Sequence, residues 1–292
     1  IVNKSQSYTG LIVGTSINDY RSNVIKKHED ILEFRVSLLK DYMKYSEFNT
    51  EPVLITYPDN KVIEDWIYNC TQKLADFEFS TTKKEIHYLW KIDDALELKW
   101  IQNIFEKIES LYIADGHHRT EATKLLSEEN ASSQFSEKDF LLSYLISEIN
   151  VKIFEFNRLV KDLNGLSKVE FLHKLSEIFI LENKDQQPYT PTEKHHFGMY
   201  LDNQFYSLIL KTENCSFKNT LDALDTQILY KKVLLPILGI EDLRNDERIE
   251  YLTGKQPIIE IKQQIDSGEF EVAFMMFPSN IEEIKDLADN NL

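Results

Sequence analysis

Cysteine is scarce in this sequence, and the little there is forms no framework. Cys70 and Cys215 are the only two cysteines in 292 residues, and they lie far apart. Two isolated cysteines argue against a disulfide-rich fold, and their separation matches no metal-binding spacing. We therefore expect a reducing compartment, the cytoplasm.

Basic residues are also in deficit. The chain has 33 Lys and Arg against 49 Asp and Glu, which gives a formal net charge of −16. Because nucleic-acid binding draws on clustered positive charge, this balance argues against a nucleic acid as the main partner, although local basic patches remain possible.

Long apolar runs are missing as well. No run approaches the roughly 20 residues that a membrane-spanning helix needs, and no secretory signal pattern begins the chain. We therefore expect no membrane partner. Since the sequence starts at Ile1 and stops at Leu292 without a terminator, we also expect the natural protein to extend beyond one or both ends.

The chain is long enough for one or two domains at about 150 residues per domain. Strand-like and helix-like patterns alternate along it, which indicates a mixed α/β (α+β) fold divided into residues 1–150 and residues 151–292. A polar loop is expected at 130–137. The main strands are predicted at 9–16, 52–58, 86–92, 111–114, 140–146, 151–156, 197–201, 204–211 and 272–277, and the main helices at 29–45, 62–74, 94–108, 120–126, 168–179, 221–235 and 280–288.

The most concentrated chemistry is the run Asp115-Gly116-His117-His118-Arg119. A strand-like apolar segment leads into it, and a segment with helical spacing follows. A helix that starts after a glycine turn presents unpaired backbone N–H groups and the positive end of its dipole, and both attract anions. With a guanidinium and two imidazoles, these residues predict a phosphate, sulfate or carboxylate site. The alternative is that the glycine only turns the chain and the histidines cap or pack.

The second candidate is the pair His28-Glu29, in the charged run 25–30. At the start of the predicted helix, Glu29 and Asp30 would complement the helix dipole, and the residues alone favour this interpretation. The alternative is that Glu29, beside a histidine and near an anion site, takes a proton from a hydroxyl nucleophile.

The third candidate is Arg158, which follows the strand-like segment 151–156. A guanidinium can clamp a carboxylate or a phosphate through two hydrogen bonds, and Lys161 could add a point charge. The alternative is that this segment is only the end of a strand, with Lys161 and Asp162 as a surface charge pair. The residues favour the two interpretations equally.

No protein metal site is predicted. His117 and His118 are adjacent and lack the i, i+4 spacing that places two ligands on one helix face, which disfavours zinc. His195 and His196 would point to opposite faces of a strand, and the charged loop 242–248 is most simply a solvated or ion-paired surface. Mg²⁺ that arrives with a nucleotide remains open.

Several segments resemble a bacterial and archaeal family, once of unknown function, that includes the free serine kinases. The run 115–119 looks like the signature of that family, and proteins of the related ParB and sulfiredoxin fold carry shorter Gly-His-Arg-type variants of it. The resemblance is to the larger bacterial members and covers nearly the whole chain, through the segments 9–14, 24–29, 157–165, 196–201, 236–242 and 267–269. It implies a ParB/sulfiredoxin-like N-terminal part and an additional α+β C-terminal part that completes the site.

The resemblance also implies an activity, namely phosphoryl transfer from ADP or ATP, with Mg²⁺, to the hydroxyl of free L-serine. In the free serine kinases the Glu of an upstream His-Glu pair is taken as the catalytic base, which makes His28 and Glu29 the catalytic candidates. The five residues 115–119 would bind the nucleotide phosphates, and Arg158 the substrate carboxylate.

Two other functions remain open. The chain could be a nucleotide- or phosphate-responsive sensor or regulator without kinase activity, since ParB-like folds also use nucleotides as conformational switches. It could also be a ParB-like DNA-binding or nuclease protein, which the acidic balance disfavours. The sequence leaves the oligomeric state open.

Overall fold

The computed structural model describes residues 2–3, 6–29, 31–129 and 137–290. Asp30 and nearly all of the polar loop predicted at 130–137 lie outside the described residues. The protein has the predicted mixed α/β (α+β) fold. It divides into two compact units, which we call unit 1 (Ile1–Val151 with Ala288–Leu292) and unit 2 (Lys152–Leu287).

Unit 1 is built on a mixed five-stranded sheet. Its strands lie in the order β3 (Leu11–Ser16), β9 (Phe140–Ser147), β5 (Val53–Tyr57), β8 (Leu111–Asp115) and β4 (Ile25–Lys26). β8 is antiparallel to β5 and parallel to β4, while β9 is parallel to β5 and antiparallel to β3. β8 is therefore held on both sides, which fixes the position of its carboxyl end.

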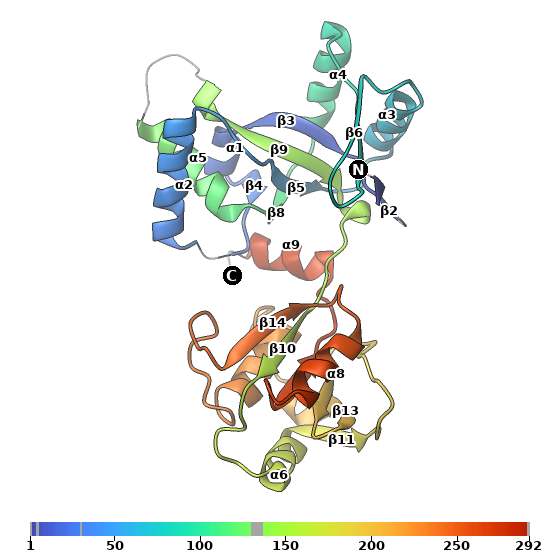
Figure 1. Ribbon diagram of the computed structural model, residues 1–292. Helices are drawn as coiled ribbons and strands as arrows, with labels where there is room; N and C mark the ends of the chain where they lie inside the picture. Colours follow the sequence, from blue (N-terminus) through green and yellow to red (C-terminus); the bar gives the residue numbers. More distant parts are fainter. Residues whose placement is uncertain (1, 4–5, 30, 130–136, 291–292) are drawn as a thin grey trace. The chain divides into compact units, whose positions relative to one another are not determined.

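The helices of unit 1 are α1 (Ile17–Arg21), α2 (Glu33–Ser46), α3 (Lys61–Thr71), α4 (Ala95–Phe105) and α5 (His117–Glu129). Figure 1 shows α2 and α5 side by side at one end of the sheet. A second, small sheet has the order β2 (Gln6–Ser7), β1 (Val2–Asn3), β7 (Ile86–Leu89) and β6 (Phe77–Ser80). Short 3₁₀ turns at Glu137–Asp139 and Glu148–Asn150 flank β9.

Apolar side chains of the central strands and of α3 form the core of unit 1. Ile55 of β5, Ile63 of α3 and Ile113 of β8 are completely buried. The end of the last helix, α9 (Ile281–Asp289), also attaches here. The Asp289 carboxylate lies 2.8 Å from Lys26 Nζ and accepts a hydrogen bond of 3.1 Å from the Tyr112 hydroxyl, so it ties together β4 and β8.

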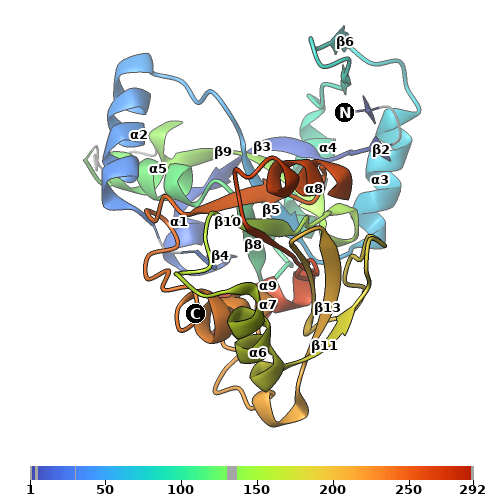
Figure 2. The same cartoon turned by 60° about the horizontal axis from the view of Figure 1, so that its bottom comes forward.

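Unit 2 contains a six-stranded antiparallel sheet. Its strands lie in the order β11 (Phe179–Asn183), β13 (Gln204–Leu210), β12 (His196–Leu201), β15 (Val272–Met275), β10 (Phe156–Val160) and β14 (Ile249–Thr253). The hairpin predicted at Asp202-Asn203 is confirmed, with φ of 48° and 58° at the two turn residues. In Figure 2, β11 and β13 lie next to each other.

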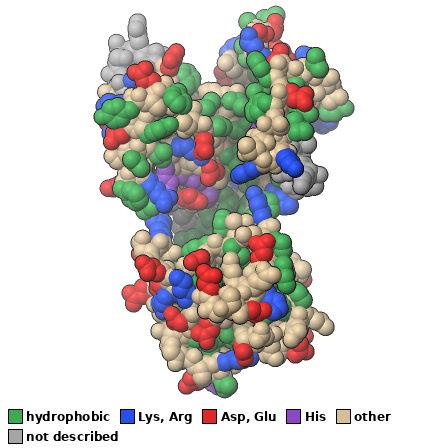
Figure 3. Space-filling model, viewed as in Figure 1, with side chains coloured by type: hydrophobic (Ala, Val, Ile, Leu, Met, Phe, Trp, Pro, Cys, Tyr) green, Lys and Arg blue, Asp and Glu red, His purple; other side chains and the backbone are tan. Residues whose placement is uncertain are grey.

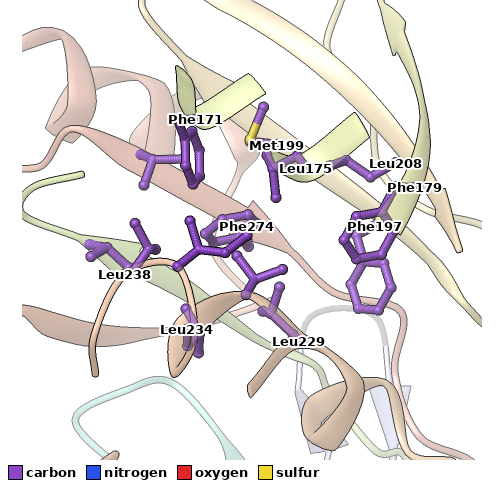
Figure 4. Close-up of a cluster of buried hydrophobic side chains, with 14 of the residues drawn as sticks. Phe171, Leu175, Phe179, Phe197, Met199, Leu208, Leu229, Leu234, Leu238 and Phe274 are labelled. Carbon is purple, nitrogen blue, oxygen red and sulfur yellow. The ribbon is translucent and has the colours of Figure 1, made fainter. Parts of the chain in front are cut away.

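The helices of unit 2 are α6 (Lys168–Ile178), α7 (Asp225–Leu229) and α8 (Ile258–Asp266), with a π-helical turn (Tyr230–Leu234) after α7. The buried apolar residues of this unit form two clusters. The larger cluster, shown in Figure 4, packs Phe171 of α6 with Phe197 of β12 and Phe274 of β15. The smaller one joins α8 to alternate residues of the same strands. The sheet is therefore buried on both faces.

The structure differs from the predicted elements at three places. The strand predicted at 151–156 begins only at Phe156, the last residue of that segment. The helix predicted at 221–235 is a short α-helix that continues as the π-helical turn. The helix predicted from Glu29 begins at Glu33, because the segment before it is held by a contact far away in sequence, described below. Strands β1, β2, β4, β6, β11 and β14 and helix α8 were not predicted.

A search of the described helices finds none that is both long and apolar enough to cross a membrane.

Replacing Ile113 by Ala should lower the free energy of unfolding of unit 1 by about 2–5 kcal/mol, because it leaves a cavity in the core. All three tryptophans, Trp66, Trp90 and Trp100, lie in unit 1, so their fluorescence during urea unfolding follows this unit. Ile12→Ala is the control, since Ile12 is 55% exposed and should lose no more than about 0.5 kcal/mol. Equal losses in the two variants would contradict this core.

Candidate functional site

The centre of the candidate site is the turn from β8 into α5. Asp115 is the last residue of β8, and His117 is the first of α5. Gly116 between them has φ of +100°, which favours glycine. A Cβ on Gly116 would lie 3.0 Å from Val53 Cγ2 and 3.2 Å from Arg119 Cζ, so both backbone conformation and space require glycine here.

The turn leaves the start of α5 rich in hydrogen-bond donors. Thr120 N–H donates to the Gly116 carbonyl at 3.0 Å, and the Thr120 hydroxyl donates to the same oxygen at 3.1 Å. The N–H groups of the helical residues before Thr120 have no acceptor within the helix. The positive end of the helix dipole lies at the same place, and the sequence-based prediction of an anion site rests on these two features.

His117 is buried and joins this helix end to Glu29. Its side chain is only 2% exposed, and its Nδ1 lies 3.3 Å from Glu29 Oε2, whose own side chain is 58% exposed. The His28 ring meets the His117 ring edge-on, with centroids 4.6 Å apart and planes at 89°. The structure therefore brings His117 together with the adjacent residues His28 and Glu29, which lie far from it in the sequence.

Burial keeps both imidazoles neutral. Desolvation lowers the pKa of His117 to about 3, and neighbouring groups, among them His28 and Lys27, act in the same direction. Desolvation also lowers the pKa of His28. The Glu29 carboxylate favours the protonated form of His117 but is largely in water, so burial outweighs it. His117 Nδ1 and Glu29 Oε2 are therefore in contact at 3.3 Å with the imidazole uncharged.

Two ring nitrogens in this cluster have no hydrogen-bond partner among the described residues. They are His117 Nε2 and His28 Nδ1, and both are buried. An unpaired buried polar atom costs free energy, and most buried polar atoms in proteins avoid that cost. The cluster is therefore poorly explained as a device for stability alone.

His118 fixes the segment that carries Glu29. Its Nε2 accepts a hydrogen bond of 3.0 Å from the Leu32 N–H. This contact holds the chain just before α2, which begins at Glu33. Glu29 is therefore not a first-turn acid of α2, as the residues alone suggested, but part of a segment pinned against α5.

Arg119 is held by neighbouring oxygens. Its Nη2 lies 2.6 Å from Asp115 Oδ2, and its Nη1 donates to the Pro52 carbonyl at 2.8 Å. Glu51 Oε2 lies 3.5 Å from the same Nη1. The guanidinium thus has a carboxylate partner on its own loop, and its side chain is 19% exposed.

Arg158 belongs to the other unit. It lies in the middle of β10 and is 9% exposed, so it does not mark a strand exit as one interpretation had it. Its Nη1–H donates to the Phe156 carbonyl, and its guanidinium carbon lies 5.4 Å from the centroid of the Tyr251 ring. Burial lowers the pKa of Arg158 to about 10.

A buried carboxylate on α5 was missed in the sequence. Glu121 is 9% exposed and accepts hydrogen bonds of 2.8 Å from the Tyr20 hydroxyl and from Lys124 Nζ. Burial raises its pKa, but the hydrogen bonds from Lys124 and Tyr20 outweigh this and lower it. The signal in the sequence that could have found Glu121 was its i, i+4 spacing from His117.

In Figure 3, acidic and histidine side chains are seen together on the surface of unit 1.

Metal-ligating side chains do not converge in the described part of the chain. A search of those residues for three or more His, Cys, Asp or Glu side chains able to hold one metal ion finds none.

A sequence model of the protein family described as "Protein of unknown function (DUF1015)" matches residues 2–227. The chain belongs to this family. No curated protein matches it.

Solved structures similar to the chain share little sequence with it. One is a free serine kinase in complex with AMP, 11% identical, with a TM-score of 0.42, covering 98% of this chain and 84% of that chain. Another is SbnI with a C-terminal truncation from Staphylococcus aureus, 12% identical, with a TM-score of 0.45, covering 96% and 78%. A third is a conserved hypothetical protein from Pyrococcus furiosus, 10% identical, with a TM-score of 0.42, covering 96% and 85%.

The depressed pKa of His117 predicts a specific acid sensitivity. Below pH 6.5 the unfolded chain binds a proton at this residue while the folded chain does not, down to about pH 3. His117 therefore destabilises the fold progressively as the pH falls through this window and has no such effect above it. Urea unfolding followed by tryptophan fluorescence should show a steeper loss of stability in the wild type than in His117→Gln between pH 6.5 and 4. Parallel curves over that range would show that His117 titrates normally.

Proposed function

We propose that this protein is a phosphotransferase that moves a phosphoryl group from ADP or ATP to the hydroxyl of a small molecule, with free L-serine as the acceptor. One observation carries the proposal: the Glu29 carboxylate lies 3.3 Å from His117, the first residue of the helix whose N-terminus forms the anion site. A candidate general base and a phosphate cradle thus share one helix end. The identity of the acceptor rests on the resemblance of residues 115–119 and of His28-Glu29 to the motifs of the free serine kinases.

The backbone of α5 would bind the nucleotide phosphates. The N–H groups after Gly116 point to where an anion binds at a helix N-terminus, and Arg119 adds a guanidinium that Asp115 already orients. Mg²⁺ bound to the nucleotide would neutralise the remaining phosphate charge, and the Asp115 carboxylate, 70% exposed, would help to hold it. Positioning and charge stabilisation are what phosphoryl transfer mainly requires.

Glu29 would act as the base. The serine hydroxyl oxygen forms the new P–O bond as its proton passes to the Glu29 carboxylate. The bond from the terminal phosphorus to the nucleotide breaks, and its electrons leave with AMP or ADP. The Glu29 side chain is 58% exposed, so a substrate hydroxyl can approach it from the solvent.

The histidines have separate roles in this proposal. His117, whose Nδ1 lies 3.3 Å from Glu29 Oε2, would orient that carboxylate, while His28 packs edge-on against the His117 ring. His118 holds the Leu32 N–H and with it the segment that carries the base. The assignment of unit 1 to the ParB/sulfiredoxin-like group belongs to the same proposal.

Glu29→Gln should lower the rate of phosphoserine formation by a factor on the order of 10² to 10⁴ while leaving nucleotide affinity close to that of the wild type, because only the proton acceptor is lost. The assay is mass-spectrometric detection of O-phosphoserine with serine, Mg²⁺ and either ADP or ATP. Glu33→Gln is the matched control, an exposed carboxylate four residues away at the start of α2, and should retain activity.

Two results would contradict this function. A Glu29→Gln protein as fast as the wild type would eliminate Glu29 as the base. A wild-type protein that binds nucleotide yet forms no phosphoserine with either donor would instead indicate a nucleotide sensor.

Gly116→Ala should weaken ADP binding by about tenfold or more in isothermal titration calorimetry, because the added Cβ strains the turn and pushes on Arg119. Gly14→Ala is the control in the same unit, since a Cβ there meets Phe140 Cβ at 3.4 Å, an ordinary contact, without a positive φ. If both variants keep wild-type affinity, the phosphates bind elsewhere.

A further inference from the structure

We propose that Arg158 is the centre of a second binding site, in unit 2, that takes the oxyanion of a small molecule, a carboxylate or a phosphate. The site is defined by a guanidinium that is buried in the sheet and lacks a negative partner. It stands whether or not the loop at Gly116 transfers phosphoryl groups.

The first argument is the missing counter-charge. Charged side chains that are buried are nearly always paired, since removing an ion from water costs several kcal/mol. Arg158 is 9% exposed, yet within the described ranges it has no ion-pair partner. One of its five N–H donors reaches the Phe156 carbonyl, which is neutral. An oxyanion would supply the charge that the protein does not.

The second argument is the geometry around the guanidinium. Arg158 lies directly opposite Tyr251 of β14 and Phe274 of β15, so both neighbouring strands present a ring beside it. The Tyr251 ring lies 5.4 Å from Arg158 Cζ. A guanidinium that stacks on an aromatic face keeps its edge donors free for two parallel hydrogen bonds to a carboxylate or a phosphate.

The third argument is access. Tyr251 is 41% exposed, and Phe156, two residues before Arg158 on β10, is 50% exposed. The residues on this end of the β10–β14 pair are therefore open to solvent although Arg158 itself is not. The proposal places the approach of a small anion past these rings.

The fourth argument is the local charge. Lys152 and Lys255 flank Phe154, with their Nζ atoms 5.0 and 4.5 Å from its ring centroid. Neither has an ion-pair partner in the part of the chain that the structure describes. Two acids are also nearby: the Glu155 carboxylate is packed against Gly254, and Asp242 adds to the effect of burial in raising the pKa of Tyr251. Lys152 precedes β10 and Lys255 follows β14, so both lie beyond the end of the paired strands where Phe156 is opposite Thr253, two residues from Arg158. In a protein of net charge −16, such positive charge attracts anions.

The test follows the guanidinium N–H signals of Arg158 by NMR in the full chain during titration with inorganic phosphate, L-serine or ethanolamine. We expect a saturable shift of the Arg158 signals, while those of Arg244, an exposed arginine of the same unit, stay in place. A shift with L-serine but not with ethanolamine, which lacks the carboxylate, identifies a carboxylate ligand. A shift with phosphate identifies a phosphate ligand.

Two variants complete the test. Arg158→Gln should lose at least about tenfold in affinity for the anion that shifts the signals, whereas Arg244→Gln should keep wild-type affinity. The NMR titration of the wild type decides the matter even if Arg158→Gln fails to fold. Unshifted Arg158 signals with millimolar phosphate and millimolar L-serine would overturn the proposal, as would unchanged affinity in a folded Arg158→Gln protein. Because the signals belong to Arg158, phosphate bound at the Gly116 loop does not mimic this result.

Discussion

The positive φ of Gly116 is the constraint on which the candidate site depends. It lets β8 end and α5 begin within one residue, so that the donors at the helix end lie directly beside the carboxyl end of a strand held on both sides. The same turn directs the His117 side chain into the interior and the Arg119 side chain back onto Asp115. The backbone conformation at Gly116 thus determines where the side chains of His117 and Arg119 lie.

From this turn, α5 organises residues that are distant in the sequence. A helix in the core of a protein normally buries apolar side chains, but α5 buries polar ones, including His117, Thr120, Glu121 and Thr123. Some of these pair within the helix or its turn, as the Thr123 hydroxyl does with the Arg119 carbonyl, whereas Glu121 also accepts a hydrogen bond of 2.8 Å from the Tyr20 hydroxyl of another helix. In contrast, the packing in Figure 4 uses apolar side chains throughout. A buried helix of this composition sacrifices apolar burial for a fixed polar arrangement, as expected of a site rather than of a core.

The sequence alone predicted those parts of the fold that local patterns determine. The strand-to-glycine-to-helix turn at 111–126 is encoded in consecutive residues and is confirmed, as is the hairpin at Asp202-Asn203. The start of α2 was misplaced because it depends on a hydrogen bond between Leu32 and His118, 86 positions apart. β14 was missed because its partly exposed residues, such as Tyr251, give no clear strand pattern. The pairing of Glu29 with His117 is likewise a tertiary contact, which no local pattern encodes.

The two arginines at the centre of these proposals are in opposite electrostatic states. Arg119 already pairs with Asp115, so an incoming phosphate gains little net charge from it and must rely on the backbone donors of α5. Binding there would depend on geometry, which only a glycine at position 116 provides. Arg158 has neutral neighbours, a backbone carbonyl and an aromatic ring, so its full charge is available to a ligand. An anion bound to Arg158 would therefore gain mainly from charge, and one bound at Gly116 mainly from the placement of donors.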